Sequence, residues 1–164
     1  AFEAHPVGVR RTVRDALPPF FEAQFPIDRL DEALLDADIL INCLPATKQT
    51  VGLLTRERLD RLKKGALFVN VGRGSIVKND DLIAALKQKQ LRGAVLDVLE
   101  EEPLAGGCPL WDMENVLLTP HIAGPSFSTN EDILAAIWDV CLENLDRYLD
   151  GKPLRHVVDW NVGY

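Results

Sequence analysis

The 164-residue sequence lacks an excess of positive charge, a closely spaced pair of cysteines and a long apolar run. Its formal net charge of −7 disfavours nucleic acid as a partner, because nonspecific binding to phosphates depends on basic surfaces. The 3 scattered cysteines favour reduced thiols over a disulfide framework or a zinc site. No apolar run approaches the length of a membrane span. We therefore expect no metal site, no nucleic-acid or membrane partner, and a cytoplasmic protein.

What the sequence does contain is the composition of an ordinary globular protein, with 47% hydrophobic and 26% charged residues. Short apolar segments alternate along it with segments of helical spacing. Strands are expected within residues 5–11, 38–45, 66–71, 94–98 and 115–120. Helices are expected within residues 27–38, 55–65, 79–93 and 128–151. Cys43 and Cys141 lie in apolar stretches, so we expect both in the core.

Capping residues mark the ends of three expected helices. Thr55 precedes one of them as its N-cap. Asn79 is expected to cap the next, with Gly93 just beyond its last residues. Ser128 and Glu131 form a capping box at the start of the long last helix.

Apolar strands that alternate with helices indicate a parallel sheet covered on both faces. We therefore predict an α/β fold with a doubly wound, Rossmann-like parallel sheet. The GxGxxG loop that opens a dinucleotide-binding half does not occur in the sequence. We accordingly expect a domain that is incomplete at its N-terminal end and belongs to a longer protein. The expected division is residues 1–127 for this domain portion, 128–150 for a connecting helix and 151–164 for a tail.

Four residues lie at or just after the ends of expected strands and should meet at one edge of the parallel sheet, which is where ligands bind in such folds. They are Pro45, Arg73, Asp97 and His121. The acidic stretch after Asp97 adds Glu102. All of these except Pro45 have an ordinary alternative. Arg73 could be a solvated loop arginine, Asp97 a hydrogen-bonded strand terminus, His121 a satisfied loop histidine and Glu102 a solvated acid.

Together these side chains suit the reduction of a ketone that lies beside a carboxylate. The planar guanidinium of Arg73 can bind the carboxylate with two parallel hydrogen bonds. His121 can donate a proton to the oxygen as hydride reaches the carbon. A carboxylate, from Asp97 or from the acidic stretch that ends at Glu102, can fix the other ring nitrogen and favour the protonated imidazole.

Six segments in order and spacing resemble the D-isomer-specific 2-hydroxyacid dehydrogenases, and the resemblance covers about residues 10–151. They read LPATKQTVGLL, GALFVNVGRGSIV, DDLIAAL, LRGAVLDVLEEEPL, PLW and NVLLTPHIAG. Within that family, RRTVR and the tail VVDWNVGY are most similar to the NADPH-using glyoxylate/hydroxypyruvate reductases. The resemblance implies a small 2-oxo acid as substrate, a homodimer, and a separate substrate domain to which the tail returns. Because the pyrophosphate loop is missing, we expect the chain by itself to be inactive.

The resemblance also implies roles for individual residues. Arg73 looks like the substrate-binding arginine, Glu102 like the partner of the histidine, and His121 like the general acid/base. Asp97 is expected near the nicotinamide carboxamide. The positions expected to line the cofactor are Arg10, Arg11, Thr12, Leu44, Pro45, Val71, Gly72, Arg73, Asp97, His121, Ala123 and Gly124.

The choice of cofactor is expected to depend on the basic end of the first strand. In NAD-specific sheets an acidic residue there binds the ribose hydroxyls and would repel a 2′-phosphate. Here Arg10 and Arg11 end the strand and Thr12 follows. We expect NADPH to be preferred, with NADH possible; a solvated basic turn is the alternative.

Two other functions fit the same resemblance. One is a dinucleotide-sensing corepressor that retains the fold without relying on turnover. The other is formate oxidation, against which Glu102 argues, because a glutamate-paired histidine suits proton transfer and formate oxidation does not require it.

Overall fold

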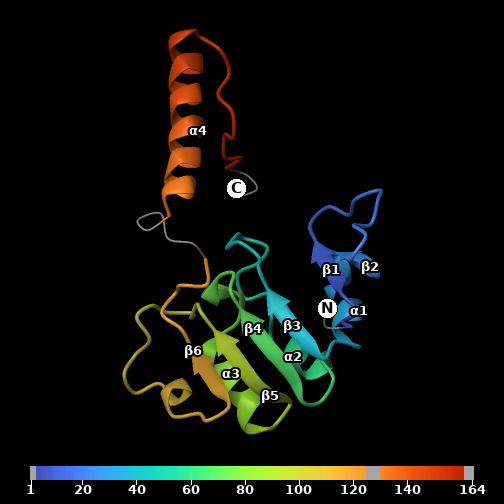
Figure 1. Ribbon diagram of the computed structural model, residues 1–164. Coiled ribbons are helices and arrows are strands. Elements are labelled where there is room, and N and C mark those ends of the chain that lie inside the picture. Colours follow the sequence, from blue (N-terminus) through green and yellow to red (C-terminus); the bar gives the residue numbers. More distant parts are fainter. Residues whose placement is uncertain (1–2, 125–129, 161–164) are drawn as a thin grey trace.

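The computed structural model describes residues 3–124 and 130–160, and shows an α/β body with one long helix lying apart from it (Figure 1). The strands are β1 (Val7–Arg10), β2 (Ala23–Pro26), β3 (Ile39–Asn42), β4 (Ala66–Asn70), β5 (Leu91–Leu96) and β6 (Val116–Leu118). The α-helices are α1 (Leu30–Leu34), α2 (Arg56–Arg61), α3 (Asn79–Lys87) and α4 (Glu131–Leu149). Short 3-10 helices occupy Ile27–Arg29, Gly74–Ile76 and Pro109–Trp111.

All strand pairs described are parallel. The larger sheet has the order β3-β4-β5-β6, and β1 pairs with β2 in a separate ribbon beside it. The predicted Rossmann-like α/β fold is therefore confirmed, as a partial domain. Strand β2 was not predicted, because Gln24 and Pro26 interrupt a segment of only 4 residues. Its backbone is nevertheless extended, because it pairs with β1 along its whole length.

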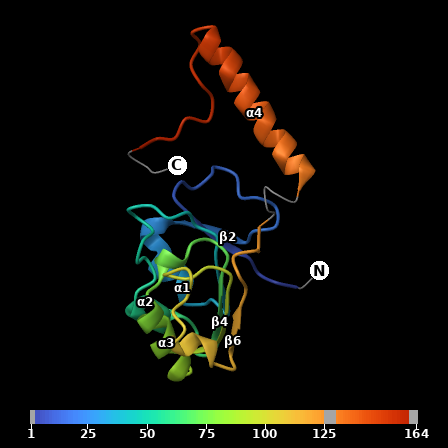
Figure 2. The same cartoon turned by 90° about the vertical axis from the view of Figure 1, so that its left-hand side faces the viewer.

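Helices α1, α2 and α3 lie on one side of the strands (Figure 2), and the core lies between them and the sheet. Alternation along β4 explains this arrangement, because Ala66, Phe68 and Asn70 are buried while the residues between them are half-buried. Leu59 from α2 and Leu82 from α3 complete the same buried cluster. Phe68 stands at its centre, with 0% of its surface exposed.

The other face of the sheet carries apolar side chains that no helix within the described residues covers. Ile41, Val69, Val95 and Leu117 are paired in register across the four strands. Ile41 and Leu117 are 59% and 58% exposed. The expectation of helices on both faces is therefore wrong for the described residues. The strands are apolar on both sides, as a doubly covered sheet requires, but this chain supplies helices to one side.

Several predicted ends and burials are also wrong. Helix α3 has Lys78 rather than Asn79 at its N-cap position, and the Asn79 N–H donates to the Glu100 carboxylate at 2.7 Å. Gly93 lies inside β5, where a Cβ atom would come within 2.8 Å of the Asn115 carbonyl oxygen. The missing side chain thus serves the close approach of two chain segments, and does not end a helix.

Helix α4 begins at Glu131, and the side chain of Asn130 caps it by accepting a hydrogen bond from Ile133 N–H at 3.1 Å. The predicted cap Ser128 and the predicted boundary between residues 127 and 128 lie outside the described residues. Thr55 does occupy the N-cap position of α2. Cys43 and Cys141 are exposed, so their predicted burial is wrong. In α4 no residue is buried, which is why the cysteine on its apolar side is accessible.

We predict that Phe68→Ala lowers the free energy of unfolding by about 3–5 kcal/mol, because it leaves a cavity at the centre of the core. Urea unfolding of the chain followed by circular dichroism measures this change. The matched control is Phe20→Ala, at a site that is 67% exposed, which should change stability little. Equal losses in the two variants would contradict the placement of the core.

Candidate active site

Two asparagines end neighbouring strands and tie the carboxyl edge of the sheet together. Asn42 ends β3 and Asn70 ends β4, and their side chains are joined by a hydrogen bond of 2.7 Å in which Asn42 Nδ2 donates. Asn42 Oδ1 accepts from Leu44 N–H at 3.1 Å, and Asn70 Oδ1 accepts from Gly72 N–H at 3.3 Å. Both side chains are buried, so this network fixes the start of two loops that carry predicted site residues. Sequence reasoning missed both asparagines. The available indication was that each is a polar residue at the end of an apolar strand.

Arg73 follows β4 and is exposed at this edge, as predicted. Its backbone carbonyl accepts from Asn70 Nδ2 at 3.3 Å, and its Nη1 donates to the carbonyl of Gly72 at 2.8 Å. At the glycines on either side of Arg73, other backbone segments of this chain fill the space that a side chain would need. A Cβ atom at Gly72 would lie 2.7 Å from the Leu44 carbonyl oxygen, and one at Gly74 would lie 1.8 Å from that of Leu99. The Arg73 turn is thus wedged between two other loops.

Glu102 and His121 are in direct contact, which confirms the predicted pairing. Nδ1 of His121 lies 2.9 Å from Oε2 of Glu102, and Oε1 of the same carboxylate accepts from Leu99 N–H at 2.9 Å. The hydrogen bond with His121, and next the one from Leu99, hold the pKa of the Glu102 carboxyl below its usual value. Both side chains are partly exposed, at 49% for His121 and 39% for Glu102, so the pair is accessible from solvent.

The turn that carries His121 is held by the buried carboxylate of Asp97. Oδ1 of Asp97 accepts from the Thr119 hydroxyl at 2.5 Å and from Ile122 N–H at 2.8 Å, while Oδ2 accepts from Ala123 N–H at 3.0 Å. Burial alone would raise the pKa of Asp97, but these hydrogen bonds, with that from Thr119 the largest, outweigh it and lower that pKa. His121 has a φ of 56°, a left-handed conformation that costs a non-glycine residue energy. The bonds to Asp97 offset that cost.

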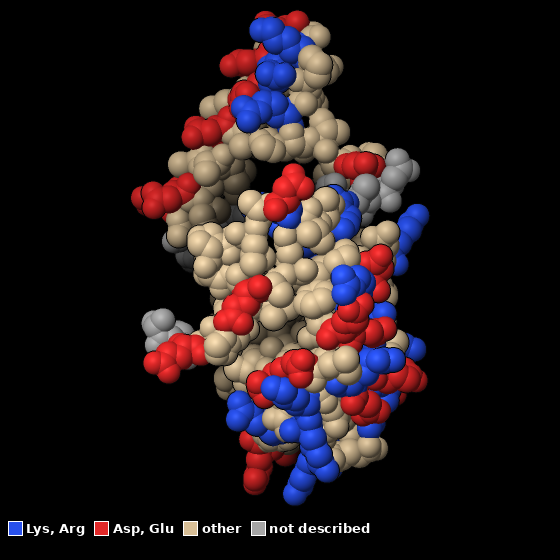
Figure 3. Space-filling model, turned by 90° about the vertical axis from the view of Figure 1, so that its right-hand side faces the viewer, with Lys and Arg blue, Asp and Glu red and all other residues tan. Residues whose placement is uncertain are grey.

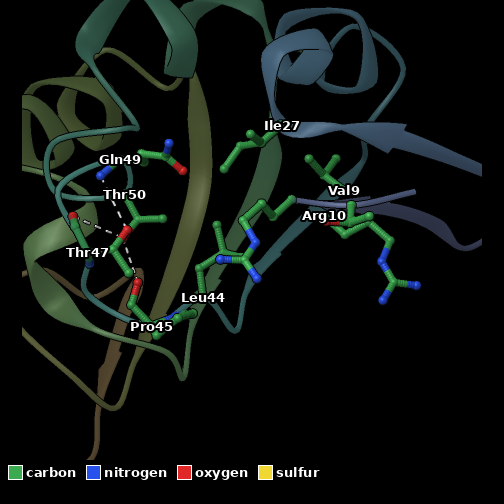
Figure 4. A pocket seen from close by; sticks show the side chains of 10 residues that line it. Val9, Arg10, Ile27, Leu44, Pro45, Thr47, Gln49 and Thr50 are labelled. Atoms are coloured by element: carbon green, nitrogen blue, oxygen red, sulfur yellow. Dashed lines mark hydrogen bonds between the residues drawn. The ribbon is translucent and has the colours of Figure 1, made fainter. Parts of the chain in front are cut away.

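The predicted cofactor positions fall into two groups in the structure. Arg10, Arg11, Thr12, Leu44 and Pro45 line one pocket of about 320 Å³. In Figure 4, Val9 and Arg10 from β1 lie on one side of this pocket and Thr47, Gln49 and Thr50 on the other. The second group lies around the ends of β4, β5 and β6, and does not line the pocket. It consists of Val71, Gly72, Arg73, Asp97, His121, Ala123 and Gly124.

The far wall of the pocket was missed by sequence reasoning. The hydroxyl of Thr50 donates to the Pro45 carbonyl at 2.6 Å and accepts from Thr47 N–H at 2.8 Å. These bonds close the loop after β3 into a compact turn that presents Gln49 to the pocket. The signal was available, because two threonines spaced by three residues favour local turns of this kind.

One face of the body is mixed in charge. On the face shown in Figure 3, Lys and Arg side chains are interspersed with Asp and Glu over the body. Within residues 3–124 and 130–160, no helix has the length and apolar character needed to cross a membrane. The same residues contain no cluster of three or more His, Cys, Asp or Glu suited to a metal ion.

The fold and its carboxyl edge are those of a dinucleotide-binding domain. Residues 1–123 match the family described as D-isomer specific 2-hydroxyacid dehydrogenase, NAD binding domain. The chain belongs to the D-isomer-specific 2-hydroxyacid dehydrogenase family.

Relatives in sequence and structure agree with this assignment. The glyoxylate/hydroxypyruvate reductase A of Salmonella newport is 38% identical over 146 residues, which is 89% of this chain and 45% of the relative. A dehydrogenase of this family from Xanthobacter autotrophicus, solved with NADPH and MES, is 38% identical with a TM-score of 0.79. That match covers 93% of this chain and 60% of the other.

An NADPH-dependent glyoxylate/hydroxypyruvate reductase from Sinorhizobium meliloti, solved with NADP and sulfate, is 32% identical with a TM-score of 0.80. That match covers 96% of this chain and 49% of the other. The chain spans about 45% of the length of the curated relatives it matches.

We predict that Asp97 contributes stability that is present at neutral pH and lost in acid. Its pKa in the folded chain lies below the unfolded value, so the contribution exists above the unfolded pKa and disappears as pH falls through the folded one. The difference in unfolding free energy between the wild type and Asp97→Asn should therefore be largest near pH 7. It should shrink below about pH 4.

Urea unfolding at a series of pH values measures this difference. Asp36→Asn, at an exposed position on another part of the body, controls for the removal of one surface carboxylate. A difference for Asp97→Asn that is the same at every pH would contradict the hydrogen-bonding scheme.

Proposed function

We propose that this chain is the cofactor-binding and proton-transfer part of a longer enzyme that reduces a small 2-oxo acid, of the glyoxylate or hydroxypyruvate kind, to the 2-hydroxy acid. The observation that carries the proposal is the hydrogen bond between His121 and Glu102 at the carboxyl edge of the sheet. A paired histidine of this kind can hold a proton at one nitrogen while a carboxylate fixes the other. The reductase relatives support the substrate class.

His121 is the proposed general acid. Its Nδ1 is fixed by Glu102, so Nε2 is the atom that would give a proton to the substrate oxygen as that oxygen gains negative charge. The carboxylate of Glu102 stabilises the imidazolium before the transfer and orients the ring throughout. The Asp97 bonds to residues 122 and 123 keep the backbone under the ring in one position.

Arg73 is the residue proposed to bind the substrate carboxylate. Its exposed guanidinium stands on a turn that is held by Asn70 and by close backbone contacts at both neighbouring glycines. A rigid base lets the planar group meet the carboxylate with two parallel hydrogen bonds and so orient the ketone. The roles of Arg73, Glu102 and His121 are those implied by family resemblance.

NADPH, when bound, supplies the hydride from its nicotinamide ring. The pocket beside β1 suits the other end of this cofactor, the adenosine. Arg10, Arg11 and Thr12 bring cationic and hydroxyl groups of the kind that bind a phosphate, while Ile27, Leu44 and Pro45 supply apolar surface for a ring. The strand ends in Arg10, with no acidic residue there to repel a 2′-phosphate. We propose that NADPH is preferred, and relatives solved with NADPH or NADP support this preference.

The long helix and the tail are proposed to contact the substrate domain of the longer protein. Helix α4 has apolar residues such as Leu134, Trp138 and Leu145 exposed along one side. The tail lies against its polar side, where Arg155 Nη1 donates to Glu143 at 2.8 Å. We further infer a homodimer, as the family resemblance implies, and a cytoplasmic location, which the scattered cysteines favour. Light scattering of the full-length protein tests the dimer.

We predict that His121→Gln lowers the turnover of glyoxylate by the full-length protein about a hundredfold, because general acid catalysis is lost. Arg73→Lys keeps the charge and loses the bidentate fork, so substrate binding should weaken while the Kd for NADPH changes little. Steady-state kinetics and fluorescence titration of NADPH measure these effects. His5→Gln, at an exposed position near the N-terminal end, is the control. Near-wild-type turnover by His121→Gln would contradict the proposal.

We predict that Arg11→Asp moves the cofactor preference of the full-length protein toward NADH. A charge-assisted bond to the 2′-phosphate contributes about 1.5–3 kcal/mol, so the ratio of kcat/KM for NADPH over NADH should fall roughly tenfold to a hundredfold. Arg14→Asp is the matched control, because Arg14 is close in sequence and does not line the pocket. Equal efficiency of the unmodified protein with both cofactors would contradict the assignment.

A further inference from the structure

Gly74, the residue after Arg73, touches the backbone of the loop that carries Glu102. A Cβ atom at this position would lie 1.8 Å from the carbonyl oxygen of Leu99, 1.9 Å from its carbonyl carbon and 2.6 Å from the nitrogen of Glu100. Real Cβ atoms essentially never come closer than 3.0 Å to such neighbours. Only a hydrogen atom fits between the two segments.

The need for glycine here is one of space and not of backbone conformation. Three other glycines, Gly52, Gly65 and Gly151, have positive φ angles, and Gly74 is not among them. The atoms that crowd Gly74 belong to the main chain, which cannot rotate away as a flexible side chain could. Any larger residue must therefore force the Gly74 turn and the Leu99–Glu100 segment apart.

That segment holds the acidic partner of the proposed general acid. Leu99 N–H donates to Oε1 of Glu102 at 2.9 Å, and Oε2 of Glu102 lies 2.9 Å from Nδ1 of His121. A run of contacts thus joins the Arg73 turn through Gly74 and Leu99 to Glu102. Relieving the contact at Gly74 requires a shift of roughly an ångström or more, which takes a hydrogen bond of 2.9 Å beyond its useful range.

We propose that Gly74 is a positioning residue, whose missing side chain sets the spacing between the Arg73 turn and the Leu99–Glu102 loop and so keeps Glu102 bonded to His121. The inference rests on the proposed function for its catalytic meaning. Its physical content concerns contacts within this chain and can be measured without turnover.

The test is a carboxyl ¹³C NMR titration of Glu102 in the 164-residue chain. In the wild type the pKa of Glu102 should lie below the ordinary glutamate value of 4.5. In Gly74→Ala it should move up toward that value, because the bonds from His121 and Leu99 are weakened. The matched control is Gly93→Ala, whose Cβ would lie 2.8 Å from another backbone carbonyl oxygen. It should lower stability and leave the Glu102 titration unchanged.

A folded Gly74→Ala chain with a wild-type Glu102 titration would overturn the inference, and so would an equal shift in both glycine variants. If Gly74→Ala does not fold, two measurements decide. The first is a nuclear Overhauser effect between the Gly74 α-protons and the Glu100 amide proton of the wild type. The second replaces the Leu99 amide by an ester, which removes the donor and should raise the pKa of Glu102. Absence of either result would overturn the inference.

The outcome also separates this inference from the proposed function. If Gly74→Ala shifts the titration and the full-length protein does not reduce 2-oxo acids, the positioning contact is retained and the activity is rejected. If the full-length protein is active, Gly74→Ala should lower kcat at least tenfold with little change in the Kd for NADPH.

Discussion

The buried carboxylate of Asp97 is the interaction on which the site depends. It directly follows the central strand β5 and accepts three hydrogen bonds from the segment after β6, two of them from the backbone of residues 122 and 123. Burying a carboxylate is costly unless it accepts hydrogen bonds, and hydrogen bonds to an ionised acceptor are stronger than those to a neutral one. Because β5 and β6 are parallel, the residue after β5 lies beside the segment after β6. The hydrogen bonds to Asp97 therefore fix the turn in which His121 has its left-handed conformation.

The sequence predicted the part of this site that follows from strand ends. In a parallel sheet every strand delivers its last residues to the same edge, so Arg73, Asp97 and His121 could be placed together from their positions after apolar segments. Family resemblance supplied the pairing of Glu102 with His121, which the structure confirms. The roles of these residues in catalysis remain predictions.

Features set by three-dimensional packing were beyond the sequence. The bond between Asn42 and Asn70 joins residues 28 positions apart, and the contact of Gly74 with the Leu99 carbonyl depends on the path of a separate loop. The exposure of Cys43 and Cys141 was mispredicted for a related reason. An apolar stretch shows that a surface can be buried, but burial also requires a covering element, and the described chain covers one face of its sheet.

The most direct test of the account is kcat for 2-oxo acid reduction by the full-length protein, compared between the wild type and Glu102→Gln. If His121 is the general acid and Glu102 fixes its ring, removal of the carboxylate should lower kcat by roughly tenfold or more while the Kd for NADPH changes little. Glu101→Gln, at an exposed neighbouring acid, should keep the wild-type kcat. Equal kcat values for the wild type and Glu102→Gln would contradict the account.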